Sequence, residues 1–287
     1  MKRLETKIQR DINTNKKQSL IRGIKNCRES KLFKGCSPLQ LRCNLAGNRT
    51  QSATFHVATV SNDYKCKTHI NLTRNNMTEF WETSFRDKQE MWGWEPADSA
   101  IVTLELFKKY GLKKILIPGF GYGRNAKIFS DNGFKVTGIE ISETAINIAQ
   151  KHFGDSIKVY HGSVGSMPFD QELYDGIFSY SLIHLLNTQE RAKLIEDCYN
   201  QLRPNGYMVF VAIAKRDFRY GQGKEISIDT FETWPGVTLY FYDYDSIKSD
   251  FSNYGLTDAE VINEPKIDMG DKPLQRFWYI ICKKQIG

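Results

Sequence analysis

The sequence has no apolar run long enough to cross a bilayer, and its basic, polar first residues lack the hydrophobic segment of a secretory signal. We therefore expect a cytoplasmic protein without a membrane span. The six cysteines form no paired CxxC motif, so their spacing argues against a zinc site. Cys198 and Cys282 fall in apolar patterns typical of buried packing residues.

Acidic residues are scarce in the first part of the chain. Residues 1–76 hold 16 Lys and Arg but only 4 Asp and Glu, a net charge of +12, whereas residues 77–287 hold the remaining 24 and 29, a net charge of −5. Such asymmetry can mark a contact with nucleic acid or with a membrane. The arm has only Phe33, Phe55 and Tyr64 as aromatic residues, which are too few for a platform that stacks bases. We therefore do not expect nucleic acid as a partner.

The chain is predicted to divide into two parts. Residues 2–31 could form a polar helix, although their apolar positions are sparse, and residues 36–69 show no sustained period. For residues 1–76 as a whole we predict a disordered or non-native extension. Met77 opens the sequence MTEFWETSF, which reads like a natural start, and every motif with chemical content lies after it. We expect residues 77–287 to form one domain.

The stretch that organises this domain runs from Lys113 to Ser142, KKILIPGFGYGRNAKIFSDNGFKVTGIEIS. Its pattern predicts a strand, a tight glycine loop, a helix and a second strand that closes with Glu140. Such a unit builds a nucleotide-binding crevice at the carboxyl ends of parallel strands. The dinucleotide fingerprint GxGxxG would need glycine at position 124, where Arg124 stands, so the pattern here is GxGxG.

This pattern resembles motif I of the class I S-adenosylmethionine-dependent methyltransferases. Further similar segments are MPF at 167–169, YDGIF at 174–178 and LRPNG at 202–206, so the resemblance covers 77–284. PGFGYGRNA and GIEISETAI look like the thiopurine and thiol methyltransferase branch. One departure is Ile117, where many class I enzymes carry an acidic residue.

The resemblance implies an α/β, Rossmann-like fold: a mostly parallel seven-stranded sheet with helices on both faces and an antiparallel last strand at 277–282. It implies S-adenosyl-L-methionine as the cofactor, with Glu140 accepting hydrogen bonds from both ribose hydroxyls. The residues that we expect around the cofactor are Trp81, Trp94, Gly119, Phe120, Gly121, Gly123, Asn125, Glu140, Ile141, Ser163, Val164 and Tyr180.

Residues 77–96 are dense in large aromatic side chains, namely Phe80, Trp81, Phe85, Trp92 and Trp94. Side chains of this kind usually pack on another surface. The segment is either an amphipathic helix docked on the sheet or a lid over the cofactor. We predict that Trp81 or Trp94 covers the cofactor.

The candidate catalytic residues lie at and after the end of the fourth strand. They are Tyr180 and His184, with Asp217 as a further candidate near the same opening. His184 has the chemistry of a general base, but a histidine at this position is more often a structural residue that caps a helix. No NPPY tetrapeptide follows the strand, which argues against the enzymes that methylate exocyclic amines of nucleic acids or side-chain amides.

Three functions agree with these features. The first is methyl transfer to a small-molecule acceptor, with a pocket shaped by residues 215–244. The second is methyl transfer to RNA or protein, with the basic arm delivering the acceptor. The third is a module that binds S-adenosylmethionine without catalysis. We favour the first, an enzyme, and no feature of the sequence predicts its oligomeric state.

Overall fold

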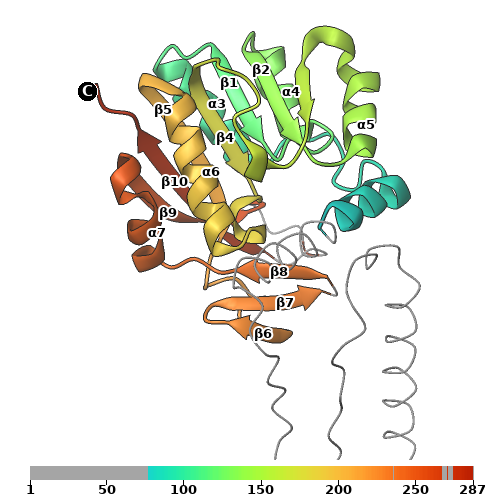
Figure 1. The fold of residues 1–287 in the computed structure, drawn as a ribbon, viewed down its shortest axis with the longest axis vertical. Coiled ribbons are helices and arrows are strands. Elements are labelled where there is room, and N and C mark those ends of the chain that lie inside the picture. Colours follow the sequence, from blue (N-terminus) through green and yellow to red (C-terminus); the bar gives the residue numbers. More distant parts are fainter. Residues whose placement is uncertain (1–76, 235, 267–269, 271–273, 287) are drawn as a thin grey trace, which may run out of the picture. The chain divides into compact units, whose positions relative to one another are not determined.

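The computed structural model describes residues 77–234, 236–266, 270 and 274–286, so the predicted arm 1–76 lies outside the described residues. The strands of the main sheet follow the order β3-β2-β1-β4-β5-β10-β9 (Figure 1). Their bounds are β1 Lys114–Pro118, β2 Lys135–Glu140, β3 Lys158–His161, β4 Tyr174–Tyr180, β5 Leu202–Ile213, β9 Leu256–Glu264 and β10 Gln275–Lys283. The last strand, β10, is antiparallel to both β5 and β9, and β1 to β5 pair in parallel. The predicted fold class and antiparallel last strand are confirmed.

Helices cover both faces of this sheet. Buried side chains of α3 Asp98–Lys109, α4 Arg124–Asp131 and α5 Glu143–Phe153 share one apolar cluster with the sheet, and those of α6 Thr188–Gln201 and α7 Tyr244–Phe251 share another. Residues 77–88 are also helical. Short 3-10 turns are η2 Gly154–Ser156, η3 Val164–Ser166, η4 Ile183–Leu185 and η5 Ser252–Tyr254.

Strand β5 shows why the sequence reads as a continuous apolar run. Val209 and Val211 lie in the cluster under α3 and α4, whereas Met208 and Phe210 lie in the cluster under α6 and α7. Successive side chains of a strand point to opposite faces, and both faces of this strand are covered. All four side chains are completely buried.

Two strands differ from the sequence prediction. Strand β5 begins at Leu202, not at Tyr207, because the predicted LRPNG turn continues the strand and pairs with Tyr174 through an irregularity. Strand β9 was not predicted. It is the edge strand of the sheet and carries exposed polar residues such as Asp258 and Glu260, so its sequence lacks an apolar period.

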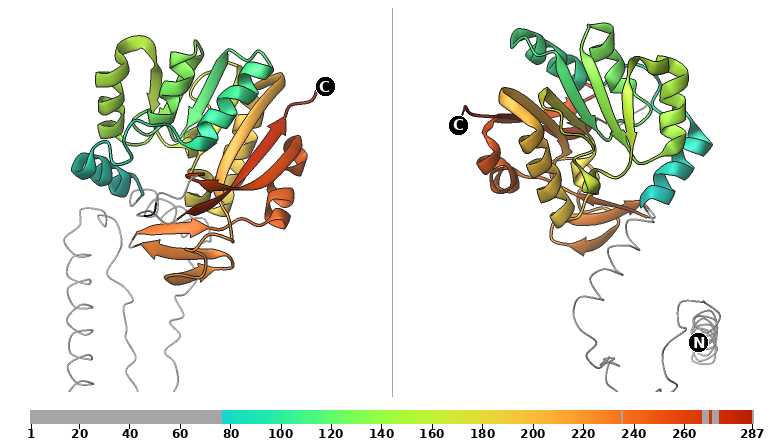
Figure 2. Two further views of the ribbon diagram at one scale, coloured as in Figure 1. Left: turned by 180° about the vertical axis from the view of Figure 1, so that it is seen from behind. Right: turned by 45° about the horizontal axis from the view of Figure 1, so that its top comes forward.

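The predicted acceptor region contains a second, antiparallel sheet, β6 Lys224–Ser227, β7 Thr230–Trp234 and β8 Val237–Tyr240. Lys215 fastens it, because the ammonium lies 2.7 Å from a carboxylate oxygen of Asp229 and 2.5 Å from one of Asp243. Both views from front and back show this sheet beyond the carboxyl ends of the parallel strands, on the same side as helix 77–88 (Figures 1 and 2).

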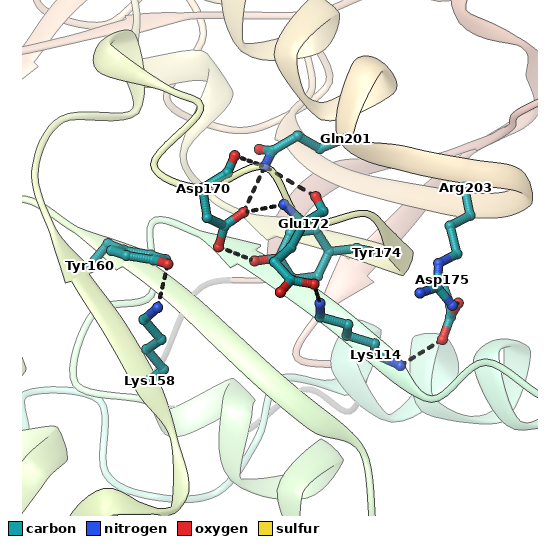
Figure 3. A network of polar contacts seen from close by, with 9 residues as sticks. All are labelled: Lys114, Lys158, Tyr160, Asp170, Glu172, Tyr174, Asp175, Gln201 and Arg203. Carbon is teal, nitrogen blue, oxygen red and sulfur yellow. Dashed lines mark hydrogen bonds and ion pairs between the residues drawn. The ribbon is translucent and has the colours of Figure 1, made fainter.

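A polar network lies at the other end of the parallel strands, where their amino ends are (Figure 3). Asp170 accepts hydrogen bonds from the hydroxyl of Tyr174 at 2.8 Å and from the amide nitrogen of Gln201 at 3.1 Å, while Lys114 pairs with Glu172. These contacts fix the segment that enters β4. They lie away from the crevice predicted to bind the ligand.

Two kinds of feature are absent from the described residues. None of their helices is both long and apolar enough to cross a membrane. They also contain no group of three or more His, Cys, Asp or Glu side chains that would hold a metal ion.

Candidate cofactor and acceptor site

The glycine loop lies between β1 and α4, where the sequence predicts it. Gly121 has a φ of +58°, a conformation that side chains other than glycine adopt rarely. A Cβ atom added there would have a single neighbour within 4 Å, an atom of the Phe85 ring at 3.9 Å, and the space beside Gly121 is otherwise open. At Gly123, by contrast, a Cβ atom would lie 2.5 Å from the Phe153 ring. Gly121 thus leaves room for a ligand, whereas Gly123 allows close packing on α5.

Two residues predicted to bind the cofactor direct their side chains elsewhere. Phe120 is buried in the core, where its ring fills the space beside Gly138. The side-chain oxygen of Asn125 accepts a hydrogen bond from Ala97 N at 2.9 Å, which fastens the connector before α3. At Phe120, only the loop backbone can contribute to a ligand site.

The Glu140 carboxylate closes β2 directly beside the loop. Gly121 N donates to its Oε2 at 2.7 Å, and Ile141 N and Ser142 N each donate to its Oε1 at 2.9 Å. An ionised carboxylate offers about four acceptor positions. The three backbone N–H groups occupy three of these positions. One ribose hydroxyl can therefore bind directly, whereas the second hydroxyl must replace one of the backbone donors. The donor set and the open loop therefore fit an adenosyl group.

Burial acts most strongly on the ionisation of Glu140 and raises its pKa, because the charged form loses its contact with water. The three backbone donors and His161 act in the opposite direction. His161 pairs with Glu140 across β3 and β2, and its Nε2 lies 3.1 Å from Ile141 O. The carboxylate thus sits in a low-dielectric environment with partners that favour its charge.

Ser163 and Val164 follow the end of β3, next to the end of β2. Ser163 is the N-cap of the turn η3, and its hydroxyl accepts a hydrogen bond from Gly165 N at 3.3 Å. Val164 is buried in the cluster under α6. The tertiary structure therefore places these two predicted residues beside Glu140 and Ile141.

The aromatic segment packs on α5 and on the glycine loop rather than on the sheet. Phe85 is 2% exposed and shares a cluster with Tyr122, Ala145 and Ile148, against which Trp81 and Trp94 also pack. Residues 77–88 form a helix, as one of the two hypotheses predicts, but this helix docks on α5 and the glycine loop and not on the sheet. This surface borders the open side of Gly121.

Tyr122 is a residue of the site that the sequence analysis missed. Its hydroxyl accepts a hydrogen bond from Trp92 N at 3.1 Å and donates one to Gly93 O at 2.7 Å. It therefore ties the aromatic segment to the glycine loop. The side chain stands at a variable position of GxGxG, so the motif gave no signal for it.

Four side chains form a row at the carboxyl ends of β4 and β5. The Arg124 guanidinium carbon lies 5.8 Å from the Tyr180 ring centre, the Tyr180 and Phe277 rings are 6.2 Å apart, and the Arg219 guanidinium carbon lies 5.8 Å from the Phe277 ring centre. Cation–π contacts of this kind hold a positive charge near an apolar surface. Only Tyr180 of the four was predicted.

The two guanidinium groups differ in their partners. Arg219 binds the Asp217 carboxylate through Nε at 2.7 Å and through a terminal nitrogen at 3.2 Å. Among the described residues, no carboxylate forms an ion pair with Arg124. Its charge is therefore available to a ligand.

The three side chains considered for proton transfer differ in their burial and in their hydrogen-bond partners. His184 is buried, its Nδ1 accepts a hydrogen bond from Ile213 N at 3.1 Å, and burial lowers its pKa to about 3. Burial likewise raises the pKa of Tyr180 to about 12. The Asp217 carboxylate accepts hydrogen bonds from Arg276 N at 2.7 Å and from Arg219.

Comparison with known proteins agrees with this geometry. A family model described as a methyltransferase domain matches residues 116–210. The chain is 25% identical over 156 residues to thiocyanate methyltransferase 1 of Brassica oleracea and 27% identical over 156 residues to that of Arabidopsis thaliana, each match covering 53% of this chain and 69% of the relative. It is also 21% identical over 150 residues to a tRNA N(3)-methylcytidine methyltransferase of Drosophila melanogaster, covering 49% of this chain and 46% of that protein.

Solved structures show the same fold. The 1,6-didemethyltoxoflavin-N1-methyltransferase of Burkholderia thailandensis, solved with its substrate and S-adenosylhomocysteine, superposes with a TM-score of 0.58 and 13% identity over 80% of this chain and 94% of that one. CcbJ methyltransferase of Streptomyces caelestis gives a TM-score of 0.55 and 16% identity over 72% and 98%. At these identities the likeness concerns the fold.

A sheet of this order with a GxGxG loop after its first strand is the fold of the class I S-adenosylmethionine-dependent methyltransferases, and the family match over residues 116–210 identifies a methyltransferase domain in this chain. The predicted cofactor is likewise confirmed. Within the class, the two plant thiocyanate methyltransferases confirm the resemblance to the thiopurine and thiol methyltransferase branch.

Proposed function

We propose that the enzyme methylates a small anionic nucleophile that binds beside Tyr180 and Phe277. The observation that carries the proposal is that the imidazole of His184 is buried, with its Nδ1 already occupied by the N–H of Ile213. His184 has a pKa of about 3 and a hydrogen-bonded Nδ1, and Tyr180 has a pKa of about 12, so neither takes up a proton readily at neutral pH. An acceptor that is already ionised needs no general base.

The charge of Arg124 supports an anionic acceptor. The guanidinium rests on the Tyr180 ring without a carboxylate partner among the described residues, and Arg219 stands at the other end of the same row. Positive charge over an apolar, aromatic surface favours a soft or planar anion over a strongly hydrated neutral group.

The glycine loop and the ends of β2 and β3 form the cofactor site in this proposal. We infer that the backbone of Gly119, Gly121 and Gly123 faces the cofactor, that Glu140 binds its ribose, and that Ser163 and Val164 border its adenine. When bound, S-adenosylmethionine supplies an activated methyl group. The role of this chain is then to align the acceptor with that methyl group and to exclude water.

Of the two tryptophans, we assign the cover over the cofactor to Trp81. One face of the Trp94 ring is occupied by His152, at 3.8 Å between ring centres and an interplanar angle of 17°. Trp81 packs on the cluster around Phe85, which borders the open side of Gly121. An indole beside a sulfonium gains about 0.5–2 kcal/mol of cation–π attraction.

The relatives support a small acceptor. Two of them are named for thiocyanate, a small anion, and they match a larger share of this chain than the tRNA methyltransferase does. We therefore assign residues 215–244, with the second sheet, to the wall of the acceptor pocket.

The test measures S-adenosylhomocysteine release over a panel of acceptors with purified enzyme. The panel contains thiolates, thiocyanate, halides, phenols, neutral amines and RNA. We expect turnover with the anions, and Arg124→Gln should raise KM for them by about tenfold. The control Arg203→Gln, at an exposed arginine near the amino ends of the strands, should stay near wild type.

Two results would contradict the proposal. Turnover confined to neutral amines or RNA would exclude the anionic acceptor. An Arg124→Gln variant that loses affinity for S-adenosylhomocysteine, as measured by calorimetry, would assign Arg124 to the cofactor instead.

A further inference from the structure

We propose that Glu82 is a positioning residue for the cofactor, acting through Ser142 on the carboxylate of Glu140. Glu82 lies on helix 77–88, ahead of the glycine loop in the chain, and belongs to no motif of the family pattern. The inference rests on the assignment of Glu140 to the cofactor ribose made above.

The first link joins Glu82 to the start of α5. The hydroxyl of Ser142 donates to Glu82 Oε2 at 2.7 Å, and Thr144 N donates to the same oxygen at 3.2 Å. The hydroxyl of Thr144 donates to Oε1. Although burial acts to raise the pKa of Glu82, these hydrogen bonds outweigh it and lower the pKa, so the group is a carboxylate at neutral pH. An acceptor at a helix N-terminus is also favoured by the helix dipole.

The second link lies within Ser142, which is completely buried. Its hydroxyl oxygen accepts a hydrogen bond from Ala145 N at 3.1 Å and so caps α5. The hydroxyl hydrogen must then find a different acceptor, and Glu82 provides it. Glu82 therefore fixes the rotation of the Ser142 side chain and the place of its backbone.

The third link joins Ser142 to Glu140. Ser142 N and Ile141 N bind Oε1 of Glu140, which directs Oε2 towards Gly121 and the open side of the loop. A small displacement of the backbone at Ser142 would turn the carboxylate, and a hydrogen bond weakens steeply when its angle departs from linear. Glu82 thus orients a group that it does not touch.

Helix 77–88 has a second anchor that is independent of Glu82. Phe85 is 2% exposed and packs against Tyr122, Ala145 and Ile148. Removing the charge of Glu82 should therefore leave the helix in place. The effect of such a change on the cofactor can be separated from the loss of the helix.

The test compares Glu82→Gln with the control Glu79→Gln, an exposed glutamate one turn earlier on the same helix. The amide of Gln keeps the size of the side chain but presents N–H groups to donors. We expect Glu82→Gln to weaken S-adenosylhomocysteine binding by about tenfold in calorimetry, and Glu79→Gln to change it by less than about twofold. Thermal unfolding without ligand should show that both variants remain folded.

A double-mutant cycle decides how Glu82 acts. If it works through Glu140, adding Glu82→Gln to a Glu140→Gln variant should cause little further loss. Losses that add in full, or normal affinity of Glu82→Gln alone, would overturn the proposal. Normal affinity of Glu140→Gln alone would instead remove the ribose assignment on which the proposal rests.

Discussion

Glu140 shows how one residue reconciles burial with charge. A carboxylate that is 6% exposed is costly unless hydrogen bonds replace water, and three backbone N–H groups do so. The same bonds leave a single acceptor position towards the ligand. The residue is therefore sensitive both to substitution and to pH.

We predict that Glu140→Ala weakens binding of S-adenosylhomocysteine by about 1.5–3 kcal/mol, the scale of hydrogen bonds to a charged group. Gly121→Val should abolish binding, because the side chain would enter the open space of the loop at a φ of +58°. Calorimetry measures both effects, and normal affinity in either variant would argue against the cofactor assignment.

The pH dependence of binding follows from the raised pKa of Glu140. On acidification this carboxyl takes up a proton before an ordinary glutamate does, and the protonated form is a poorer acceptor. Cofactor affinity should therefore fall as the pH is lowered, whereas Glu140 itself favours the folded state more at low pH, because the folded state binds the proton more tightly. Calorimetry over a pH series, with Glu140→Gln as the control that lacks this titration, checks the prediction.

His184 should not appear in the pH dependence of the rate. Its pKa of about 3 and the hydrogen bond from Ile213 N make it a neutral structural group at the end of β5. We expect kcat/KM for an anionic acceptor to show no inflection near pH 6.5 that His184→Gln removes. Such an inflection, lost in the variant, would instead restore His184 as the general base.

At the scale of elements, three sets of contacts join the aromatic segment to α5 and to the glycine loop. Phe85 packs on α5, Tyr122 binds the backbone of Trp92 and Gly93, and Glu82 binds the start of α5. These contacts combine an apolar surface with directional hydrogen bonds. The segment is thus built to lie over the glycine loop.

We predict that this segment becomes more ordered when cofactor binds. Tryptophan fluorescence should change on addition of S-adenosylhomocysteine, and cleavage between Arg86 and Lys88 should slow. Tyr122→Phe, which removes the hydroxyl that binds Trp92 N and Gly93 O, should speed cleavage without ligand. An unchanged spectrum together with unchanged cleavage would reduce Trp81 and Trp94 to packing residues.

At the scale of the whole chain, the distribution of charge separates two acceptor classes. Residues 1–76 carry a net charge of +12, whereas the enzyme domain carries −5. One relative is named for methylation of tRNA, so RNA is the alternative acceptor to be tested. The proposed small acceptor, by contrast, binds within the domain and gives the arm no part in the reaction.

Deleting residues 1–76 should therefore leave turnover with a small anion unchanged. S-adenosylhomocysteine release by the full chain and by residues 77–287 provides the comparison, with thermal unfolding as the check that the shorter chain folds. A large loss of turnover, or an RNA-dependent rate that only the full chain shows, would favour the macromolecular acceptor.

The sequence by itself determined the parts whose contacts are local. The strand, glycine loop, helix and strand of 113–142 follow from short-range patterning, and Ser142 caps α5 as its residue type predicts. The mostly parallel, seven-stranded sheet and its antiparallel last strand came from the family resemblance that these local motifs carry. The local elements and the family resemblance thus both rest on motifs whose residues are close together in the sequence.

The tertiary structure alone decided which distant residues meet. Glu82 reaches Ser142 and Thr144, and Arg124 and Arg219 flank Tyr180 and Phe277, although no periodicity links these positions. The protonation states of side chains likewise depend on the tertiary structure. His184 carries a side chain suited to a base, and only burial in the folded chain lowers its pKa to about 3, because desolvation depends on everything that packs around the ring.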